Sequence, residues 1–362
     1  MRRRNDLTLL ALIILLLCGP MGLGAQNAPQ GPPPASAAAP ASNPPSAPGQ
    51  SGAAAAPAPA GQQPETEGGT FVFRKQVEEV LLHATVMDDK QRLVTNLERN
   101  AFMVYEDGKP QTITSFRHED IPVSMGIVID NSGSMREKRK KVDDAALNLV
   151  RASNPQDEVF VVNFNDEYYL DQPFTNKLGP LKEALEKIES RGGTALYDAV
   201  LASADYLKRN ARLEKKVLFV VTDGEDNASR ESLEQAVRHL QEENGPTVYS
   251  IGLLGEEKQR RARRALQVMA QRTGGIAFLP KTLDEVDAIS KTVAHDIRNQ
   301  YTIGYKPGNP KTSGGYRTIR VDAKAQGYSK LAVRTRSGYY AGQQRGTASS
   351  PTSGLTPPPR LP

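Results

Sequence analysis

The stretch Val123-Ser124-Met125-Gly126-Ile127-Val128-Ile129-Asp130-Asn131-Ser132-Gly133-Ser134 decides how this chain is expected to fold. Its first part, Val123 to Ile129, is an apolar run typical of a parallel strand that is covered on both faces. A polar loop follows at once, and Gly133 allows that loop to turn sharply. The stretch therefore predicts a buried strand that ends in a loop rich in side-chain oxygen atoms.

Downstream of this strand, short apolar segments alternate with segments of helical period. Such alternation predicts an α/β fold, a doubly wound Rossmann-like domain with a mostly parallel sheet and helices on both faces. Further strands are expected over residues 158–164, 168–170, 216–221, 248–254 and 276–279. Helices are expected over residues 137–152, 181–188, 195–208, 233–242, 259–271 and 283–299.

In both flanks of this domain, apolar and polar residues alternate as they do in β-strands. Before it, strands are expected over 77–86, 102–105 and 112–116, with a turn at Asp107-Gly108 between the last two. After it, strands are expected over 301–305, 316–322 and 331–335. The domain, 121–300, is thus inserted between an N-terminal β unit, 70–120, and C-terminal β strands, 301–340. We hypothesise that the two flanks share one sheet or sandwich.

The N-terminal residues 1–26 have the composition of a secretory signal peptide. Arg2, Arg3 and Arg4 precede the apolar run Leu7–Leu17, which is shorter than the roughly 20 residues of a membrane span. We therefore expect export, to the periplasm, the cell surface or the medium. A retained N-terminal anchor and a lipid on Cys18 are the alternatives, and either would be the only link to a membrane.

Residues 27–69 and 341–362 predict a disordered linker and a disordered tail. From 27 to 64 the chain has no charged residue and no apolar side chain larger than alanine, so it cannot form a core.

Cys18 is the only cysteine, which excludes disulfides and zinc–thiolate sites from the exported protein. The net charge of +5 falls to +3 without the three arginines and Asp6 of the signal, which argues against nucleic acid as a partner. The basic runs 136–141 and 258–264 are interpreted as solvated helix faces.

Three loops carry the polar residues of interest. They contain Asp130 to Ser134, Gly193-Thr194 and Thr222-Asp223-Gly224. Because ligands of an open parallel sheet gather outside the carboxyl ends of its strands, we expect these loops to converge. The side chains that would meet there all offer oxygen: Asp130, Ser132, Ser134, Thr194 and Asp223. Hydroxyl and carboxylate oxygens suit a hard divalent cation, with Mg²⁺ expected and Ca²⁺ or Mn²⁺ as alternatives.

The pattern Asp130-x-Ser132-x-Ser134, with a distant Thr194 and a later Asp223, resembles the metal-ion-dependent adhesion site of von Willebrand factor A domains. The likeness covers roughly residues 122–300 and includes Thr273-Gly274-Gly275. The flanking runs, such as Tyr301-Thr302-Ile303-Gly304-Tyr305, resemble exported bacterial proteins related to that family.

The resemblance implies a role for each residue of the site. Ser132 and Ser134 would bind the metal directly, and Thr194 would do so directly or through water. Asp130 and Asp223 would act through bound water and hydrogen bonds. An Asp or Glu carboxylate of a protein partner would then complete the coordination shell. The resemblance also implies that the last helix, 283–299, can shift and relay binding to the β flank.

Catalysis has little support in the sequence. The first loop lacks the glycine patterns of dinucleotide and P-loop sites, and no Gly-x-Ser-x-Gly elbow surrounds Ser132 or Ser134. The four histidines are scattered along the chain and show no spacing typical of metal ligands.

Two alternatives to a binding module stay open: a structural or envelope-assembly protein with a stabilising metal, and a metal-dependent hydrolase with Asp223 or Glu225 as its base. Asn131 is expected to face away from the site, and Asp226 to be solvated. The sequence does not predict the oligomeric state.

Overall fold

The computed structural model describes residues 79–186, 190–254, 259–309 and 313–342. The expected signal, 1–26, the linker, 27–69, and the tail beyond Gly342 lie outside the described residues. Within the described part, no helix is long and apolar enough to cross a membrane.

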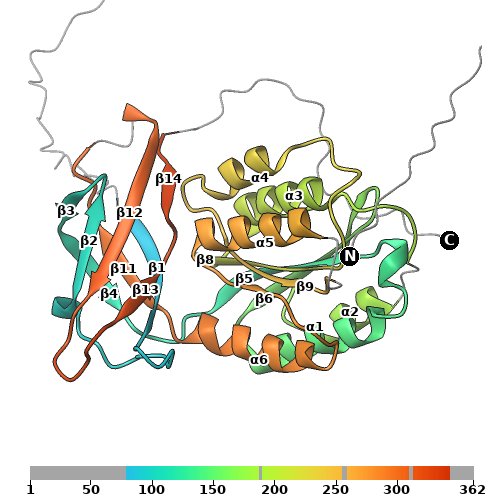
Figure 1. Ribbon diagram of the computed structural model, residues 1–362, viewed down its shortest axis with the longest axis horizontal. Helices are drawn as coiled ribbons and strands as arrows, with labels where there is room; N and C mark the ends of the chain where they lie inside the picture. The colour runs from blue at the N-terminus through green and yellow to red at the C-terminus, as the bar shows by residue number, and fades with distance from the viewer. Residues whose placement is uncertain (1–78, 187–189, 255–258, 310–312, 343–362) are drawn as a thin grey trace, which may run out of the picture. The chain divides into compact units, whose positions relative to one another are not determined.

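A six-stranded sheet forms the centre of the α/β domain, in the order β10-β9-β8-β5-β6-β7 (Figure 1). β5 pairs in parallel with both β6 and β8, and only the edge strand β7 runs antiparallel. All eight residues of β5 are buried, as its apolar run predicts. The strands span β5 Val123–Asp130, β6 Glu158–Phe164, β7 Tyr168–Thr175, β8 Lys215–Thr222, β9 Thr247–Gly252 and β10 Ala277–Phe278.

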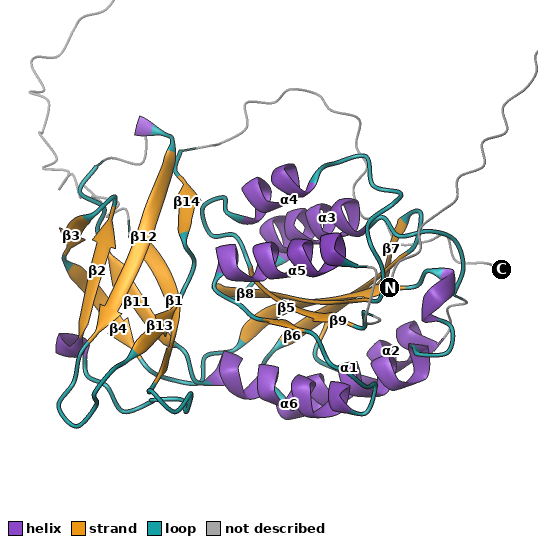
Figure 2. Cartoon of the chain, in the orientation of Figure 1, coloured by secondary structure: helices purple, strands orange, loops and turns teal. Residues whose placement is uncertain are grey.

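Helices cover both faces of this sheet (Figure 2). Side chains of α1, α2 and α6 share one core with the odd-numbered residues of β8, Val217, Phe219 and Val221. Side chains of α3, α4 and α5 share the other core with Leu218 and Val220. The helices span α1 Arg139–Ala152, α2 Leu178–Glu186, α3 Leu196–Asn210, α4 Leu233–Leu240, α5 Arg260–Thr273 and α6 Glu285–Arg298. The predicted doubly wound α/β fold class is therefore confirmed.

The two flanks share two four-stranded sheets, ordered β13-β1-β11-β4 and β14-β12-β2-β3. β1, which precedes the α/β domain, pairs with β11, which follows it, and Leu82 lies opposite Ile303. β2 likewise pairs with β12. These pairings confirm that the flanks are joined. The strands span β1 Val80–Met87, β2 Phe102–Glu106, β3 Lys109–Gln111, β4 Ile113–Arg117, β11 Tyr301–Tyr305, β12 Tyr316–Ala323, β13 Ala332–Arg334 and β14 Gly338–Tyr340.

The hairpin at Asp107-Gly108 corrects one expectation. Both residues have positive φ, 49° and 77°, as a tight two-residue hairpin turn requires. The strand that follows the turn is β3, however, and not the predicted strand over 112–116. β4 occupies most of that stretch and pairs with β11 in the other sheet. Pro110 is tolerated in β3 because β3 is an edge strand, where a missing N–H breaks no ladder bond.

Candidate metal centre

The loop after β5 is fixed by hydrogen bonds to its neighbours in the sheet. Asp130 is fully buried. Its Oδ1 accepts the backbone N–H of Ser132 at 2.8 Å, and its Oδ2 accepts the hydroxyl of Thr222, the last residue of β8, at 2.5 Å. The backbone N–H of Asn131 donates to Phe164 at the end of β6. The loop is therefore held from both strands that border β5.

The two serines and Asp223 form a chain of hydrogen-bonded oxygen atoms. The hydroxyls of Ser132 and Ser134 lie 3.2 Å apart. The Ser134 hydroxyl donates to Asp223 Oδ1 at 2.7 Å, across 89 residues of sequence. Ser132 and Asp223 are buried, whereas Ser134 is exposed. The group consequently opens to solvent at Ser134.

Thr194, in the second loop, lies against the third loop, which carries Asp223. Its backbone N–H donates to Asn227 Oδ1 at 2.9 Å, and its side chain is buried. Its hydroxyl lies beside Gly224, 3.4 Å from where a Cβ would stand on that residue. The backbone N–H of Gly133 in turn donates to the carbonyl of Gly192, which joins the first loop to the second. All five predicted residues thus come from three loops that contact one another.

The electrostatics of the site combine a buried carboxylate, Asp130, with a second carboxylate, Asp223, that is paired with an ammonium. Burial raises the pKa of Asp130; hydrogen bonds from Thr222 and Ser132 lower it in part, and the charge of Asp223 raises it further. Asp223 itself is paired with Lys138, whose ammonium contacts Asp223 Oδ2. Since a buried carboxylate is stabilised by a nearby cation, the site favours positive charge at its mouth.

The donor set has the composition that a hard divalent cation takes. It offers three hydroxyls and two carboxylates, and no nitrogen or sulfur. Among the described residues there is no group of three or more His, Cys, Asp or Glu that could hold a metal by itself. By their chemistry the hydroxyl and carboxylate oxygens fit a hard divalent cation, and the bound cation stays a prediction.

Several residues around the site were not predicted from the sequence. Lys138 and Arg139 belong to the basic run interpreted as a solvated face, and for Arg139 that interpretation is wrong. Arg139 is buried beneath the loop, where it donates to the carbonyl of Asp130 and to Asn163 and pairs with Asp143 at 3.1 Å. A run of basic residues gives no sign of which one turns inward.

The expectation for Asp226 also needs correction, and Asn131 has a structural role that the sequence did not predict. Asn131 is buried, and its Oδ1 accepts the hydroxyl of Ser190, so that it ties the first loop to the second. Asp226 is half-buried and accepts the backbone N–H of Tyr197 at 2.9 Å. These bonds span 59 and 29 residues of sequence, so no local pattern marks them.

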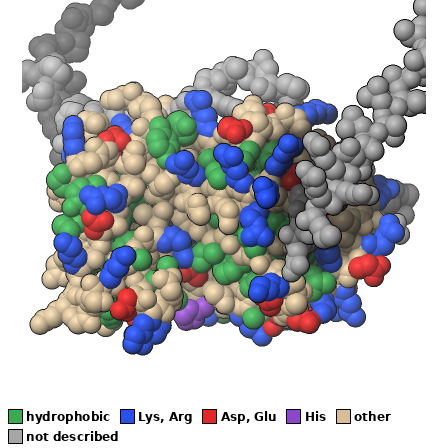
Figure 3. Space-filling view, viewed as in Figure 1, with side chains coloured by type: hydrophobic (Ala, Val, Ile, Leu, Met, Phe, Trp, Pro, Cys, Tyr) green, Lys and Arg blue, Asp and Glu red, His purple; other side chains and the backbone are tan. Residues whose placement is uncertain are grey.

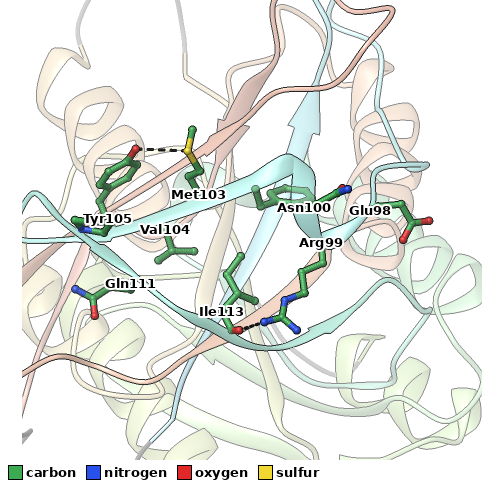
Figure 4. A pocket seen from close by; sticks show the side chains of 10 residues that line it. Glu98, Arg99, Asn100, Met103, Val104, Tyr105, Gln111 and Ile113 are labelled. Atoms are coloured by element: carbon green, nitrogen blue, oxygen red, sulfur yellow. Dashed lines mark hydrogen bonds between the residues drawn. The ribbon is translucent and has the colours of Figure 1, made fainter.

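A separate pocket of about 540 Å³ lies on the β-rich flank, along β2 and β3 (Figure 4). Figure 4 shows Tyr105 and Met103 side by side at one end and Arg99 reaching the carbonyl of Ile113 at the other. The walls are mostly apolar side chains and backbone. None of the five predicted site residues lines this pocket.

Comparison with known proteins supports the family resemblance for part of the chain. Residues 125–225 match the family model of the von Willebrand factor type A domain. A search of curated proteins gives no match.

Solved structures give distant likenesses. Proximal thread matrix protein 1 from the mussel byssus is 18% identical, with a TM-score of 0.41; the match covers 49% of this chain and 48% of that one. The von Willebrand factor domain of a type V pilus tip protein from Porphyromonas gingivalis is 13% identical, with a TM-score of 0.41 and coverages of 49% and 97%. A von Willebrand factor type A protein from Catenulispora acidiphila is 14% identical, with a TM-score of 0.43 and a coverage of 74% of each chain. None of these likenesses indicates a function.

Proposed function

We propose that this chain is an exported binding protein that captures an acidic side chain of a protein partner through a divalent cation, Mg²⁺ in the first place. The observation that supports the proposal is the hydrogen-bonded chain Ser132–Ser134–Asp223 next to buried Asp130, with Ser134 open to solvent. The match of residues 125–225 to the von Willebrand factor type A domain points the same way.

The hydroxyl and carboxylate residues of the site would have different roles in binding the cation. Ser132, Ser134 and Thr194 would hold the cation through their hydroxyls, while Asp130 and Asp223 supply negative charge and orient the serines. A bound cation offers a Lewis-acidic position to a carboxylate oxygen from outside. Because only two of the five site residues are carboxylates, the charge of a bound divalent cation would stay incompletely balanced, which favours an acidic partner. Ser134, at the exposed end of the group, marks where that partner would enter.

A hydrolase is the less favoured alternative. A general base needs a free carboxylate close to the reacting water. Asp223 is engaged by Ser134 and Lys138, and Glu225 accepts the backbone N–H of Arg261 at 3.3 Å. Neither acid is therefore placed as an unengaged base. Turnover of a panel of peptides and phosphoesters that requires Asp223 would reverse this preference.

The proposal is tested by partner capture from envelope and culture fractions with Mg²⁺ and with EDTA. The bound protein should be released by EDTA while the circular dichroism of the chain stays unchanged. Ser134→Ala should lose the partner, whereas Ser329→Ala, an exposed serine of the β-rich flank, should retain it. Capture that survives EDTA contradicts the proposal. If EDTA instead unfolds the chain, the metal has the stabilising role of a structural protein.

A further inference from the structure

The exposed face of α5 carries a concentration of arginine. Its buried face consists of Ala262, Ala265, Leu266, Met269, Ala270 and Thr273. Its exposed residues are Arg260, Arg261, Arg263, Arg264, Gln271 and Arg272, and the helix contains no acidic residue. We call these five arginines the α5 arginine face. In Figure 3, blue Lys and Arg side chains gather on the face of the molecule where α4 and α5 lie in Figure 1.

Within the described residues, none of these five arginine side chains forms an ion pair, although the carboxylate of Glu225 accepts the backbone N–H of Arg261. The basic residues of α1 differ, because Arg139 pairs with Asp143 and Lys141 pairs with Asp284. Four of the five arginines of α5 lie in its first turns, next to the positive end of the helix dipole, where cations are unfavourable. Arg260 and Arg264 are also four residues apart and repel each other. The arrangement lowers the stability of the free helix, and an acidic partner would relieve that cost.

The α5 arginine face begins beside the candidate metal centre. The backbone N–H of Arg261 donates to Glu225, which lies two residues after Asp223. β9, which leads into α5, pairs with β8, and the backbone N–H of Leu253 donates to the carbonyl of Thr222. A segment that places a carboxylate at Ser134 therefore has the α5 arginine face within its reach along the same edge of the sheet.

We propose that the α5 arginine face binds an acidic segment of the partner protein, next to the carboxylate that enters at Ser134. This inference rests on the proposed function and adds the chemistry of the partner: a cluster of Asp or Glu residues, not a single one. Arginine suits carboxylates because its planar guanidinium can donate two parallel hydrogen bonds. Gln271 on the same face adds an amide that can bond to a peptide backbone.

The test uses the full chain and a short fluorescent peptide of alternating Glu and Gly, with binding followed by anisotropy in Mg²⁺ and in EDTA. The variant is the triple substitution Arg260→Gln, Arg263→Gln and Arg264→Gln. Glutamine already occupies this face and has a similar helix propensity, so the fold should be kept. The control is Lys109→Gln, Lys324→Gln and Lys330→Gln, which removes the same charge from exposed positions of the β-rich flank.

The α5 variant should bind the peptide at least about tenfold more weakly, and the control less than about threefold more weakly. Both should bind Mg²⁺ as the unchanged chain does in calorimetry. Peptide binding that is lost in EDTA but equal in the two variants overturns this inference and leaves the proposed function standing. Binding that persists in EDTA but is lost in the α5 variant supports the arginine face and contradicts the proposed function. If the arginines bind a sulfated polysaccharide or phosphatidylglycerol vesicles but not the peptide, the assignment to an acidic protein segment is wrong.

Discussion

Asp223 lies between two competing partners. Its Oδ1 accepts the Ser134 hydroxyl, and its Oδ2 contacts the ammonium of Lys138. The Asp223 side chain is almost fully buried, while that of Lys138 is 29% exposed. A divalent cation held by the serines would stand near the same ammonium. Because like charges repel, Lys138 should lower the affinity of the site for metal.

Replacing Lys138 with methionine should therefore strengthen metal binding. The substitution removes the charge and retains an unbranched side chain. We expect the affinity for Mg²⁺ to rise about fivefold, equivalent to about 1 kcal/mol, since partial exposure screens the repulsion. Isothermal titration calorimetry measures the change. Lys140→Met, two residues further along the chain and exposed on α1, is the matched control and should leave the affinity unchanged. A weaker affinity in the Lys138 variant would mean that Lys138 orients Asp223 for the metal.

The sequence predicted the five oxygen-bearing residues because their spacing and their place after strands are local features. The loop that contains Thr222 was expected at the site, but the hydrogen bond of Thr222 to Asp130 and the contact of Lys138 with Asp223 were not predicted. The contact of Thr222 with Asp130 spans 92 residues, and it depends on β8 lying next to β5. That adjacency follows from the strand order, which no local pattern contains.

At the scale of elements, α3 and α4 are joined by a charged histidine. His239 of α4 contacts Asp205 of α3 at 2.8 Å and Glu242 at 3.0 Å. Burial by itself would lower the pKa of His239, but the hydrogen bonds to Asp205 and Glu242 override it and raise the pKa to about 9. The histidine is thus protonated at neutral pH in the folded protein.

This pairing predicts a pH dependence of stability. The pKa of His239 in the folded protein is raised above its ordinary value of 6.5, so its contribution is fully present below that pH and is lost as the pH rises through about 9. The difference in unfolding free energy between the unchanged chain and His239→Gln should fall over this window, by at most about 3 kcal/mol. Urea titrations at several pH values measure it. A difference that is constant with pH would show that His239 is not charged in the fold.

The sequence predicted the bounds of some strands accurately and missed other strands. Glu158–Phe164 and Tyr301–Tyr305 coincide with β6 and β11, because a run of apolar residues or a strict alternation marks a strand clearly. β3 and β14 were not predicted. Each has three residues and lies at an edge of its sheet; β13 is as short, but it falls within the longer stretch 331–335 that was predicted. Their positions depend on pairing with β2 and β12, which are long-range contacts.

At the scale of the whole described unit, Asp296 of α6 connects the α/β domain to the β-rich flank. It accepts hydrogen bonds from Thr85 of β1 at 3.1 Å, from Tyr249 of β9 at 2.5 Å and from Arg334 of β13 at 2.6 Å. Asp296 is buried. These are the contacts that a shift of the last helix would have to change in order to reach the flank, and that relay stays a prediction.

Asp296→Ala should destabilise the protein strongly. The substitution removes the only carboxylate paired with the Arg334 guanidinium among the described residues and the acceptor of the buried Tyr249 hydroxyl, at a cost of about 3 kcal/mol. Asp287→Ala, nearer the start of the same helix, breaks a largely exposed pair with Lys291 and a hydrogen bond from Asn148, and should cost about a third as much. Equilibrium urea unfolding gives both values. Equal costs would mean that Asp296 does not hold the two parts together.

The central claim, that the five oxygen side chains bind a divalent cation, is tested most directly by titrating the full chain with Mn²⁺ under electron paramagnetic resonance. We predict one ion per chain, displaced by Mg²⁺, and no specific binding in the double variant Ser132→Ala and Ser134→Ala. The variant should remain folded, because it loses only two hydroxyls at the edge of the sheet. Binding of equal strength in the double variant, or no binding by the unchanged chain, would contradict the account.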